Sequence, residues 1–196
     1  GMLPDEMKGS KMYGVELDSI SGRIAKQLYQ NSNIAIEGYE ETKLPDSFFD
    51  VAVGNVPFGN FKVVDKKYDR LNFNIHDYFF AKTLDKVRPN GVIAFITSKG
   101  TMDKQNDKIR KYICQRAELI GSIRLPNNTF KANAGTIVTS DIIFLKKRDK
   151  ITDIEDEWVH LDKNQDGIEM NSYFVKHPEM ILGRMEMTSG RFGPES

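Results

Sequence analysis

A short apolar segment that ends in a proline turn constrains the fold of this chain more than any other feature. Residues 49–60 read FDVAVGNVPFGN, and the first five have the length and β-branched content of a buried strand. Gly54 and Pro57 end that strand abruptly, so Asn55 and Phe58 come just at or beyond its carboxyl end. Open α/β sheets bind their ligands at this edge. The segment therefore predicts an α/β protein with a site at the strand end.

The residues of this turn suit a planar base. The Asn55 amide oxygen and the Val56 backbone carbonyl can accept hydrogen bonds from one exocyclic amino group, while Phe58 stacks on the ring that carries it. Asn55-Val56-Pro57-Phe58 resembles the Asn-Pro-Pro-Phe/Tyr motif of S-adenosylmethionine-dependent N6-adenine DNA methyltransferases. Val56 stands where the motif has its first proline, and it preserves the backbone carbonyl. The alternative is an ordinary strand that ends in a proline turn.

Strand and helix patterns alternate along most of the chain. Strands are predicted at residues 12–17, 34–36, 49–55, 91–97, 119–125 and 137–145, and helices from Asp18 or Ser19 and over residues 74–87 and 103–116. This alternation predicts an α/β fold with a mostly parallel, doubly wound sheet and an antiparallel edge hairpin, the Rossmann-like layout of methyltransferases. We expect the first four strands to lie parallel in one sheet, with residues 137–145 antiparallel at one edge.

A change in composition suggests a domain boundary. Residues 146–157 are rich in charge, so we expect a methyltransferase-like domain over residues 1–148 and a carboxyl-terminal appendage over 149–196. Within the appendage, a short strand is predicted at 158–161 and a helix at 172–182, broken by Pro178.

Composition limits the function classes. The chain has 28 basic and 28 acidic residues, and zero net charge argues against strong autonomous binding of duplex DNA. The one cysteine, Cys114, suits a buried thiol in a reducing cytoplasm. No apolar run approaches the roughly 18 residues of a membrane span, so we expect a cytoplasmic protein. Residues 162–167 resemble the first half of a calcium-binding loop, but Tyr173 stands where the bidentate glutamate is needed, so we expect a polar turn and no metal site.

Acidic residues after the first strands are candidates for binding the cofactor. Glu16 follows the first strand, where a carboxylate can accept hydrogen bonds from both ribose hydroxyls of a nucleoside. The family resemblance implies that Glu16 binds the ribose of S-adenosylmethionine, that Leu17 packs on its adenine and that Asn55 lies beside it. The resemblance also implies an acidic side chain that binds the adenine amino group of the cofactor. We favour Glu40, with Glu37 and Glu41 as alternatives.

An aromatic residue in a later loop is a candidate for a second stacking ring. Phe130 precedes the last predicted strand. The family places an aromatic residue here, on the opposite face of the extruded base from Phe58. The resemblance therefore implies that the two rings sandwich one base, which contributes a few kcal/mol of stacking.

The resemblance begins at the family's second strand. The family's first strand and its glycine-rich cofactor loop have no counterpart before Met12, so we expect weak or absent cofactor binding. Residues 158–187 resemble the segment after the methylase part of large methylase–helicase proteins of bacterial mobile elements. The expected partners are DNA and either a missing amino-terminal segment, a specificity subunit or a helicase region; a homodimer is the remaining alternative.

These features favour one function and leave two others open. The first is methylation of the N6 amino group of adenine in DNA, of the restriction–modification or mobile-element type. The second is a non-catalytic or partner-dependent remnant of such a domain. The third is methylation of a protein glutamine, whose side chain presents a similar planar amide.

Overall fold

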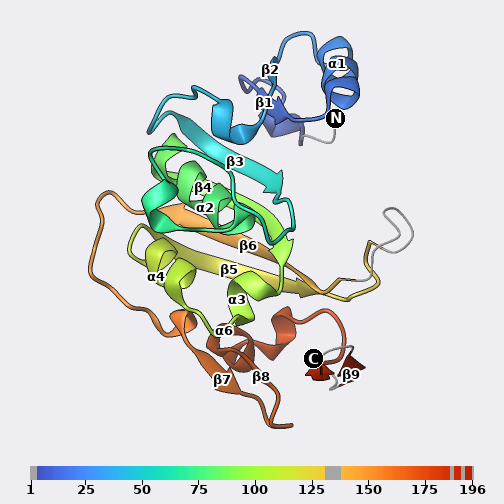
Figure 1. Cartoon of the computed structure of the whole chain (residues 1–196), viewed down its shortest axis with the longest axis vertical. Helices are drawn as coiled ribbons and strands as arrows, with labels where there is room; N and C mark the ends of the chain where they lie inside the picture. Colours follow the sequence, from blue (N-terminus) through green and yellow to red (C-terminus); the bar gives the residue numbers. More distant parts are fainter. Residues whose placement is uncertain (1–3, 131–137, 186–187, 191–192, 196) are drawn as a thin grey trace. The chain divides into compact units, whose positions relative to one another are not determined.

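The computed structural model describes residues 4–130, 138–185, 188–190 and 193–195. The chain forms two compact units, coloured along the sequence in Figure 1: unit 1 comprises Gly1–Leu44 and Val63–Lys67, and unit 2 comprises Pro45–Lys62 and Tyr68–Ser196. Beside the elements discussed below, short 3-10 helices lie at Asp5–Met7, Tyr39–Glu41, Asp69–Leu71 and Pro178–Met180, and the short strands β9 and β10 at Thr188–Gly190 and Gly193–Glu195.

Unit 1 is a small β-α-β arrangement. Strand β1 (Tyr13–Glu16) pairs in parallel with β2 (Asn33–Ile36), and helix α1 (Ser19–Leu28) connects them. Asp18 caps α1 as predicted, because its carboxylate accepts the Ser21 backbone N–H at 2.6 Å. Three apolar residues recur at four-residue spacing on α1, and all three, Ile20, Ile24 and Leu28, are exposed. No apolar side chain is buried among the described residues of this unit. Unit 1 therefore has no hydrophobic core of its own.

Unit 2 contains a four-stranded mixed sheet in the order β3-β4-β6-β5. Strand β3 (Phe49–Asn55) confirms the predicted motif strand, and it pairs in parallel with β4 (Val87–Ser98). Strands β5 (Ala117–Leu125) and β6 (Ser140–Lys147) form the predicted antiparallel hairpin at the sheet edge.

Two details of the predicted sheet are wrong. β1 and β2 form a sheet of their own instead of joining β3 and β4, and β6 lies between β4 and β5 instead of at the edge. The burial of β6 explains its interior place, because Ile143 and Leu145 are fully buried whereas Ile120 on β5 is exposed.

Strand β4 begins earlier than predicted. The predicted helix over 74–87 ends at Lys86, and the chain enters β4 at once, so Pro89-Asn90-Gly91 forms an irregularity within the strand instead of a turn after the helix. Asn90 has a left-handed backbone, with φ at 62°. A Cβ at Gly91 would lie 2.8 Å from the Asp50 carbonyl oxygen and 2.9 Å from that of Arg88. Glycine is therefore required where β3 approaches this part of β4.

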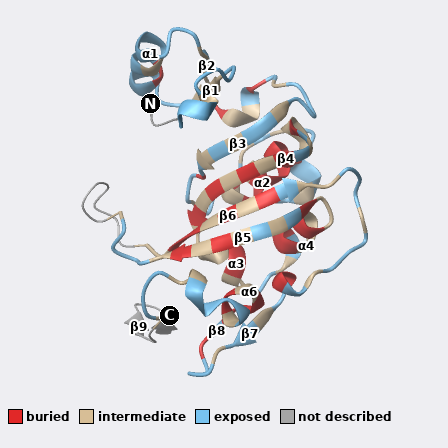
Figure 2. Cartoon of the chain, turned by 180° about the vertical axis from the view of Figure 1, so that it is seen from behind, coloured by how far each residue is buried: buried red, intermediate tan, exposed pale blue. Residues whose placement is uncertain are grey.

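Helices cover one face of this sheet. Helices α2 (Ile75–Lys86), α3 (Gly100–Asp103) and α4 (Lys108–Cys114) lie on the face toward the viewer in Figure 1, and behind the strands in Figure 2. Phe80, Leu84 and Val87 are fully buried, and Cys114 is buried as predicted. Residues on β4 alternate between buried and half-buried, and Ile93 and Phe95 are buried in the core between the sheet and the helices.

The predicted helix over 103–116 is two helices. The chain is extended at Lys104, which ends α3, and α4 begins only at Lys108. Tertiary charge pairs account for the break, because the side chains of Asp103 and Lys104 bind Arg124 and Asp77, respectively. Helical periodicity alone does not reveal such pairs.

The carboxyl-terminal segment packs on the rest of unit 2. Trp158 lies in a 3-10 helix (Glu157–Val159) instead of the predicted strand, and the strand β7 (Leu161–Lys163) follows and pairs with β8 (Glu169–Asn171). The Asn171 amide donates to the carbonyl oxygens of Trp158 (2.8 Å) and of Met102 in α3 (2.9 Å). These two hydrogen bonds attach the end of β8 to the 3-10 helix and to α3. Helix α6 (Ser172–Lys176) stops before Pro178, as predicted.

Candidate functional site

The motif turn lies at the carboxyl ends of two neighbouring parallel strands. Asn55 is the last residue of β3 and is in register with Ile96 of β4. The Val56 N–H donates to the Ile96 carbonyl at 2.9 Å, which extends the β3–β4 ladder by one residue and buries the Val56 side chain. Pro57 and Phe58 then leave the sheet and are exposed. The turn is thus fixed at its base and open toward solvent at its tip.

Two acceptors of the turn are available to a ligand. Asn55 is exposed, and its side-chain amide makes no hydrogen bond within the described ranges. Val56 uses its N–H in the sheet, while its carbonyl accepts no hydrogen bond from the described residues. No described residue therefore forms a hydrogen bond with either of the two groups that are predicted to accept one from an amino group.

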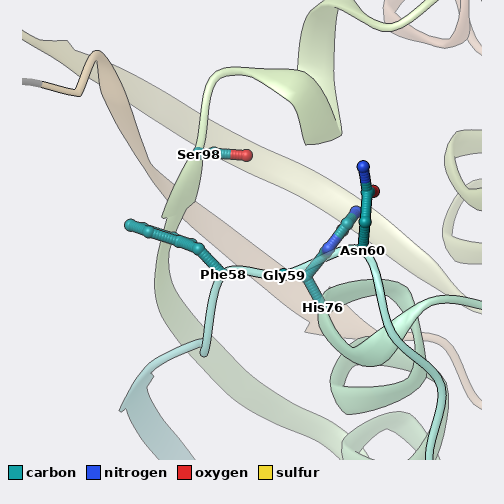
Figure 3. A pocket seen from close by; sticks show the side chains of 5 residues that line it. All are labelled: Phe58, Gly59, Asn60, His76 and Ser98. Carbon is teal, nitrogen blue, oxygen red and sulfur yellow. The ribbon is translucent and has the colours of Figure 1, made fainter.

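A pocket of about 270 Å³ lies beside the turn. It is lined by Phe58, Gly59, Asn60, His76 and Ser98. Figure 3 shows the Ser98 hydroxyl directed over the turn, with Phe58 to one side of Gly59 and the side chains of His76 and Asn60 to the other. Pockets for drug-sized ligands start at about 300 Å³, so this pocket suits a single ring system better than an entire nucleoside cofactor.

His76 contributes an uncharged imidazole to this pocket. Its side chain is 16% exposed, and its Nε2 lies 3.5 Å from Oδ1 of Asp77. Burial is the main cause that lowers the pKa of His76, and the Lys104 ammonium lowers it further. The Asp77 carboxylate and a hydrogen bond to the Gly59 backbone oppose this shift. With a pKa below its ordinary value of 6.5, the ring is neutral at pH 7.

Asp77 links the pocket to the segment after α3. Its Oδ2 accepts from the Lys104 ammonium at 2.5 Å, and the Lys104 carbonyl in turn accepts from Arg110 at 2.8 Å. Oδ1 of Asp77 is buried and has no hydrogen-bond partner among the described residues. Of the two Asp77 oxygens, the one that faces His76 is therefore the one without a hydrogen bond from the described residues.

Three of the four predicted cofactor residues, Glu16, Leu17 and Glu40, belong to unit 1. Glu16 ends β1, in register with Ile36 at the end of β2, and the 3-10 helix that contains Glu40 follows β2. Because parallel strands end at the same edge, the structure brings Glu16 and the segment of Glu40 to one edge of this small sheet. Leu17 is largely exposed. Asn55 and Phe58 lie in unit 2.

One Glu16 oxygen is already engaged. Oε1 accepts the Asp18 backbone N–H at 2.9 Å, which orients the carboxylate and leaves Oε2 for a ligand. The Glu40 side chain lies over Gly38 and is half-buried. Carboxylates placed in this way fit ribose hydroxyls and an adenine amino group, which are hydrogen-bond donors.

Phe130 does not line the pocket. It is half-buried in the segment after β5, and residues 131–137, which continue its loop, lie outside the described part of the chain. Its predicted stacking role stays a prediction.

Sequence reasoning missed three residues of the pocket: Asn60, His76 and Ser98. Ser98 ends β4, and the rule that parallel strand ends share one edge was sufficient to find it. His76 lies within the predicted helix over residues 74–87, and its sequence pattern carries no signal for a pocket. In the described ranges, no group of three histidine, cysteine, aspartate or glutamate residues could hold a metal ion. None of the helices there is long and apolar enough to cross a membrane.

Comparisons with solved structures define the class of fold. A putative class I S-adenosylmethionine-dependent methyltransferase from Listeria monocytogenes is similar, with a TM-score of 0.59 and 20% identity, over 76% of this chain and 49% of that one. A modification subunit of a putative type I restriction enzyme from Vibrio vulnificus gives a TM-score of 0.59 at 14% identity, over 83% of this chain and 47% of that one. The fold is therefore the predicted Rossmann-like methyltransferase fold.

Sequence comparison defines the family. The profile of the N-6 DNA Methylase family matches residues 5–178. Defense against restriction protein B of Escherichia phage P1 is 34% identical over 145 residues, which is 71% of this chain and 6% of that protein. The chain belongs to the N-6 DNA Methylase family, as the Asn55–Phe58 motif predicted, and it spans a small part of this relative.

Proposed function

We propose that this chain is part of an enzyme that transfers a methyl group from S-adenosylmethionine to the N6 amino group of adenine in DNA. One observation carries the proposal. The turn Asn55-Val56-Pro57-Phe58 has two hydrogen-bond acceptors that no described residue uses, on Asn55 and Val56, and it stands beside a pocket that suits one planar ring system and to which Phe58 contributes. Membership of the N-6 DNA Methylase family supports it.

The residues of the turn would act by positioning and polarising the amine. The Asn55 amide oxygen and the Val56 carbonyl accept the two N–H groups, which raises the electron density on the nitrogen and directs its lone pair away from the ring. Phe58 stacks on the extruded base and offsets part of the cost of unstacking it. S-adenosylmethionine supplies the electrophilic methyl group. No further base is needed for the attack, since the proton is lost after the nitrogen has become positively charged.

On the cofactor side, Glu16 and Glu40 would hold the nucleoside, with Leu17 against its adenine. The lack of a buried apolar side chain among the described residues of unit 1 supports weak binding. We expect a dissociation constant no tighter than roughly 0.1 mM, about −5.5 kcal/mol. Calorimetric titration with S-adenosylmethionine measures it, and a micromolar constant would contradict this expectation.

The lack of a buried apolar side chain among the described residues of unit 1 also favours a second candidate function, that of a module that depends on a partner. A β-α-β unit without a core gains stability when another segment covers the α1 stripe of Ile20, Ile24 and Leu28, which is exposed in the structure. The partner would be an amino-terminal segment, a specificity subunit or a helicase region of a longer protein, or a second copy of the chain. DNA remains the proposed substrate, in a restriction–modification or mobile-element setting.

Transfer of a radiolabelled methyl group to DNA tests the proposal. We expect label in adenine-containing DNA at millimolar S-adenosylmethionine, none with Asn55→Ala, and unchanged transfer with the control Asn106→Ala, whose residue is exposed and outside the pocket. Label in glutamine-containing peptides but not in DNA would favour the protein glutamine alternative. Transfer that is undiminished in Asn55→Ala would overturn the assignment of the turn.

A further inference from the structure

The pocket beside the motif turn contains a hydroxyl group that the described part of the chain leaves open to a ligand. Three of the lining residues have polar side chains: Asn60, His76 and Ser98. The Asn60 side-chain oxygen accepts from the Asn74 amide at 3.3 Å, and Nε2 of His76 lies 3.5 Å from Asp77. The Ser98 hydroxyl, by contrast, forms no hydrogen bond with any described residue. Figure 3 shows it directed over the turn, where a bound ring would meet it.

The backbone at Ser98 is held from both sides. Strand β4 lies between β3 and β6 in the sheet, and β3 pairs with it as far as Ile96. On the other side, Ser98 is in register with Ser140 of β6. One residue further, the Lys99 N–H donates to the Thr139 carbonyl at 3.0 Å. A polar group on such a fixed strand end is already in place when a ligand enters.

Ser98 and Asn55 project from the same face of the sheet. Asn55 is in register with Ile96, and side chains alternate between the two faces, so Ser98, two residues beyond Ile96, shares the face of Asn55. Thr97 precedes Ser98 and points to the opposite face, where its hydroxyl is buried 2.9 Å from that of Thr101. A planar ring held by Asn55 at the end of β3 therefore lies next to the hydroxyl at the end of β4.

We infer that Ser98 is a base-binding residue: its hydroxyl donates a hydrogen bond to the adenine ring nitrogen next to the amino group. The inference rests on the proposed function, in which Asn55 and Val56 hold that amino group, and it adds a contact from outside the Asn55–Phe58 motif. Adenine presents an acceptor nitrogen on each side of its amino group, N1 on one edge and N7 on the other. A serine hydroxyl rotates to suit either acceptor.

A matched pair of variants isolates the hydroxyl. Threonine and valine are both β-branched and suit a strand, and they differ by a hydroxyl in place of a methyl group. We expect Ser98→Val to bind a single-stranded oligonucleotide with one central adenine about fivefold more weakly than Ser98→Thr, the effect of one neutral hydrogen bond. The unmodified chain and Ser98→Ala should differ by a similar factor, and this second pair decides should the added methyl group block the pocket.

Two controls separate the contact from general effects. Ser19→Ala also removes a serine hydroxyl, from an exposed residue of α1 outside the pocket, and should bind as the unmodified chain does. The Ser98 variants should melt within a few degrees of the unmodified chain, because Ser98 is half-exposed and its hydroxyl has no hydrogen bond within the described residues to lose. Equal adenine binding by the unmodified chain and Ser98→Ala would overturn the inference.

Analogues of adenine identify the atom that the hydroxyl contacts. In 1-deazaadenine and in 7-deazaadenine, a C–H replaces one of the two acceptor nitrogens. We expect the difference between the unmodified chain and Ser98→Ala to disappear with one analogue and to persist with the other. A difference that persists with both analogues, or with neither, would overturn the inference.

A strand with an abasic site in place of the central adenine keeps this inference distinct from the proposed function. If the unmodified chain binds the two strands equally, the proposed function fails, and the inference fails with it. If the preference for adenine is present and is lost in Asn55→Ala, but is the same in the unmodified chain and in Ser98→Ala, the proposed function stands and the inference is overturned. We expect a preference for adenine that Asn55→Ala abolishes and Ser98→Ala reduces about fivefold.

Discussion

The buried ion pair between Arg124 and Asp141 provides a quantitative test of how unit 2 is held together. The two residues face each other across β5 and β6 and are 1% and 0% exposed. Arg124 donates from Nε and Nη2 to the two Asp141 oxygens at 2.8 and 2.9 Å. Its Nη1 lies 2.7 Å from Asp103, and its guanidinium lies over the Phe174 ring at 4.2 Å. One cation therefore joins the hairpin, α3 and the carboxyl-terminal segment.

Replacing Arg124 by Met leaves the buried Asp141 carboxylate without its partner. Loss of one member of a buried pair costs about 3–5 kcal/mol, because the remaining charge stays desolvated. For a chain of this length, each kcal/mol lowers the melting temperature by about 2–4 °C, so we expect a loss of about 6–20 °C. Urea unfolding followed by the fluorescence of Trp158, the one tryptophan and a buried residue of unit 2, measures the free energy.

Two variants control this experiment. Arg88→Met removes a solvent-exposed pair with Asp50 and should cost less than about 1 kcal/mol. The double variant Arg124→Met/Asp141→Leu replaces both charges of this pair and should recover part of the loss, because the Asp103 carboxylate still lacks its cation. The reasoning is refuted if Arg124→Met costs less than about 1 kcal/mol, or if the double variant is no more stable than Arg124→Met.

Three further predictions concern the site. Phe58→Ala should weaken binding of an adenine-containing single strand by roughly 1–3 kcal/mol in a fluorescence titration while leaving the melting temperature unchanged, because Phe58 is 43% exposed; an equal loss of stability would show a structural role. The free energy of unfolding should fall as the pH drops below 6.5, because the pKa of His76 is lowered by folding and the unfolded chain binds the proton more strongly; urea unfolding at pH 5 and pH 7.5 should show a smaller pH dependence in His76→Leu. Joining a strand and glycine-rich loop of the family ahead of Met12 should strengthen S-adenosylmethionine binding, as measured by calorimetry. An unchanged dissociation constant would count against the proposed reason for weak cofactor binding.

The sequence predicted those features that depend on local patterns. The apolar run over residues 49–55 is strand β3, Asp18 caps α1, and the alternation of strands and helices indicated the fold class. Pro57 placed the turn correctly, because proline cannot continue the hydrogen-bonded ladder, whereas Gly54 lies within β3 in register with Phe95.

Features that depend on contacts between distant residues were not predictable in this way. The break between α3 and α4 follows from the charges that bind Asp103 and Lys104, and the irregularity at Gly91 from the approach of the Asp50 carbonyl. His76 enters the pocket only because the start of α2 lies against the turn after β3. The separate β1–β2 sheet was missed since strand periodicity does not specify which strands pair.

The central claim is that the turn after β3 presents the exocyclic amine of adenine for methylation. Identifying the methylated atom tests it most directly: DNA is incubated with the chain and millimolar S-adenosylmethionine, digested to nucleosides and analysed by mass spectrometry. We predict N6-methyladenine as the product, formed by the unmodified chain and absent with Asn55→Ala. A methyl group on another atom of the bases, or the same yield of N6-methyladenine with Asn55→Ala, would contradict the claim.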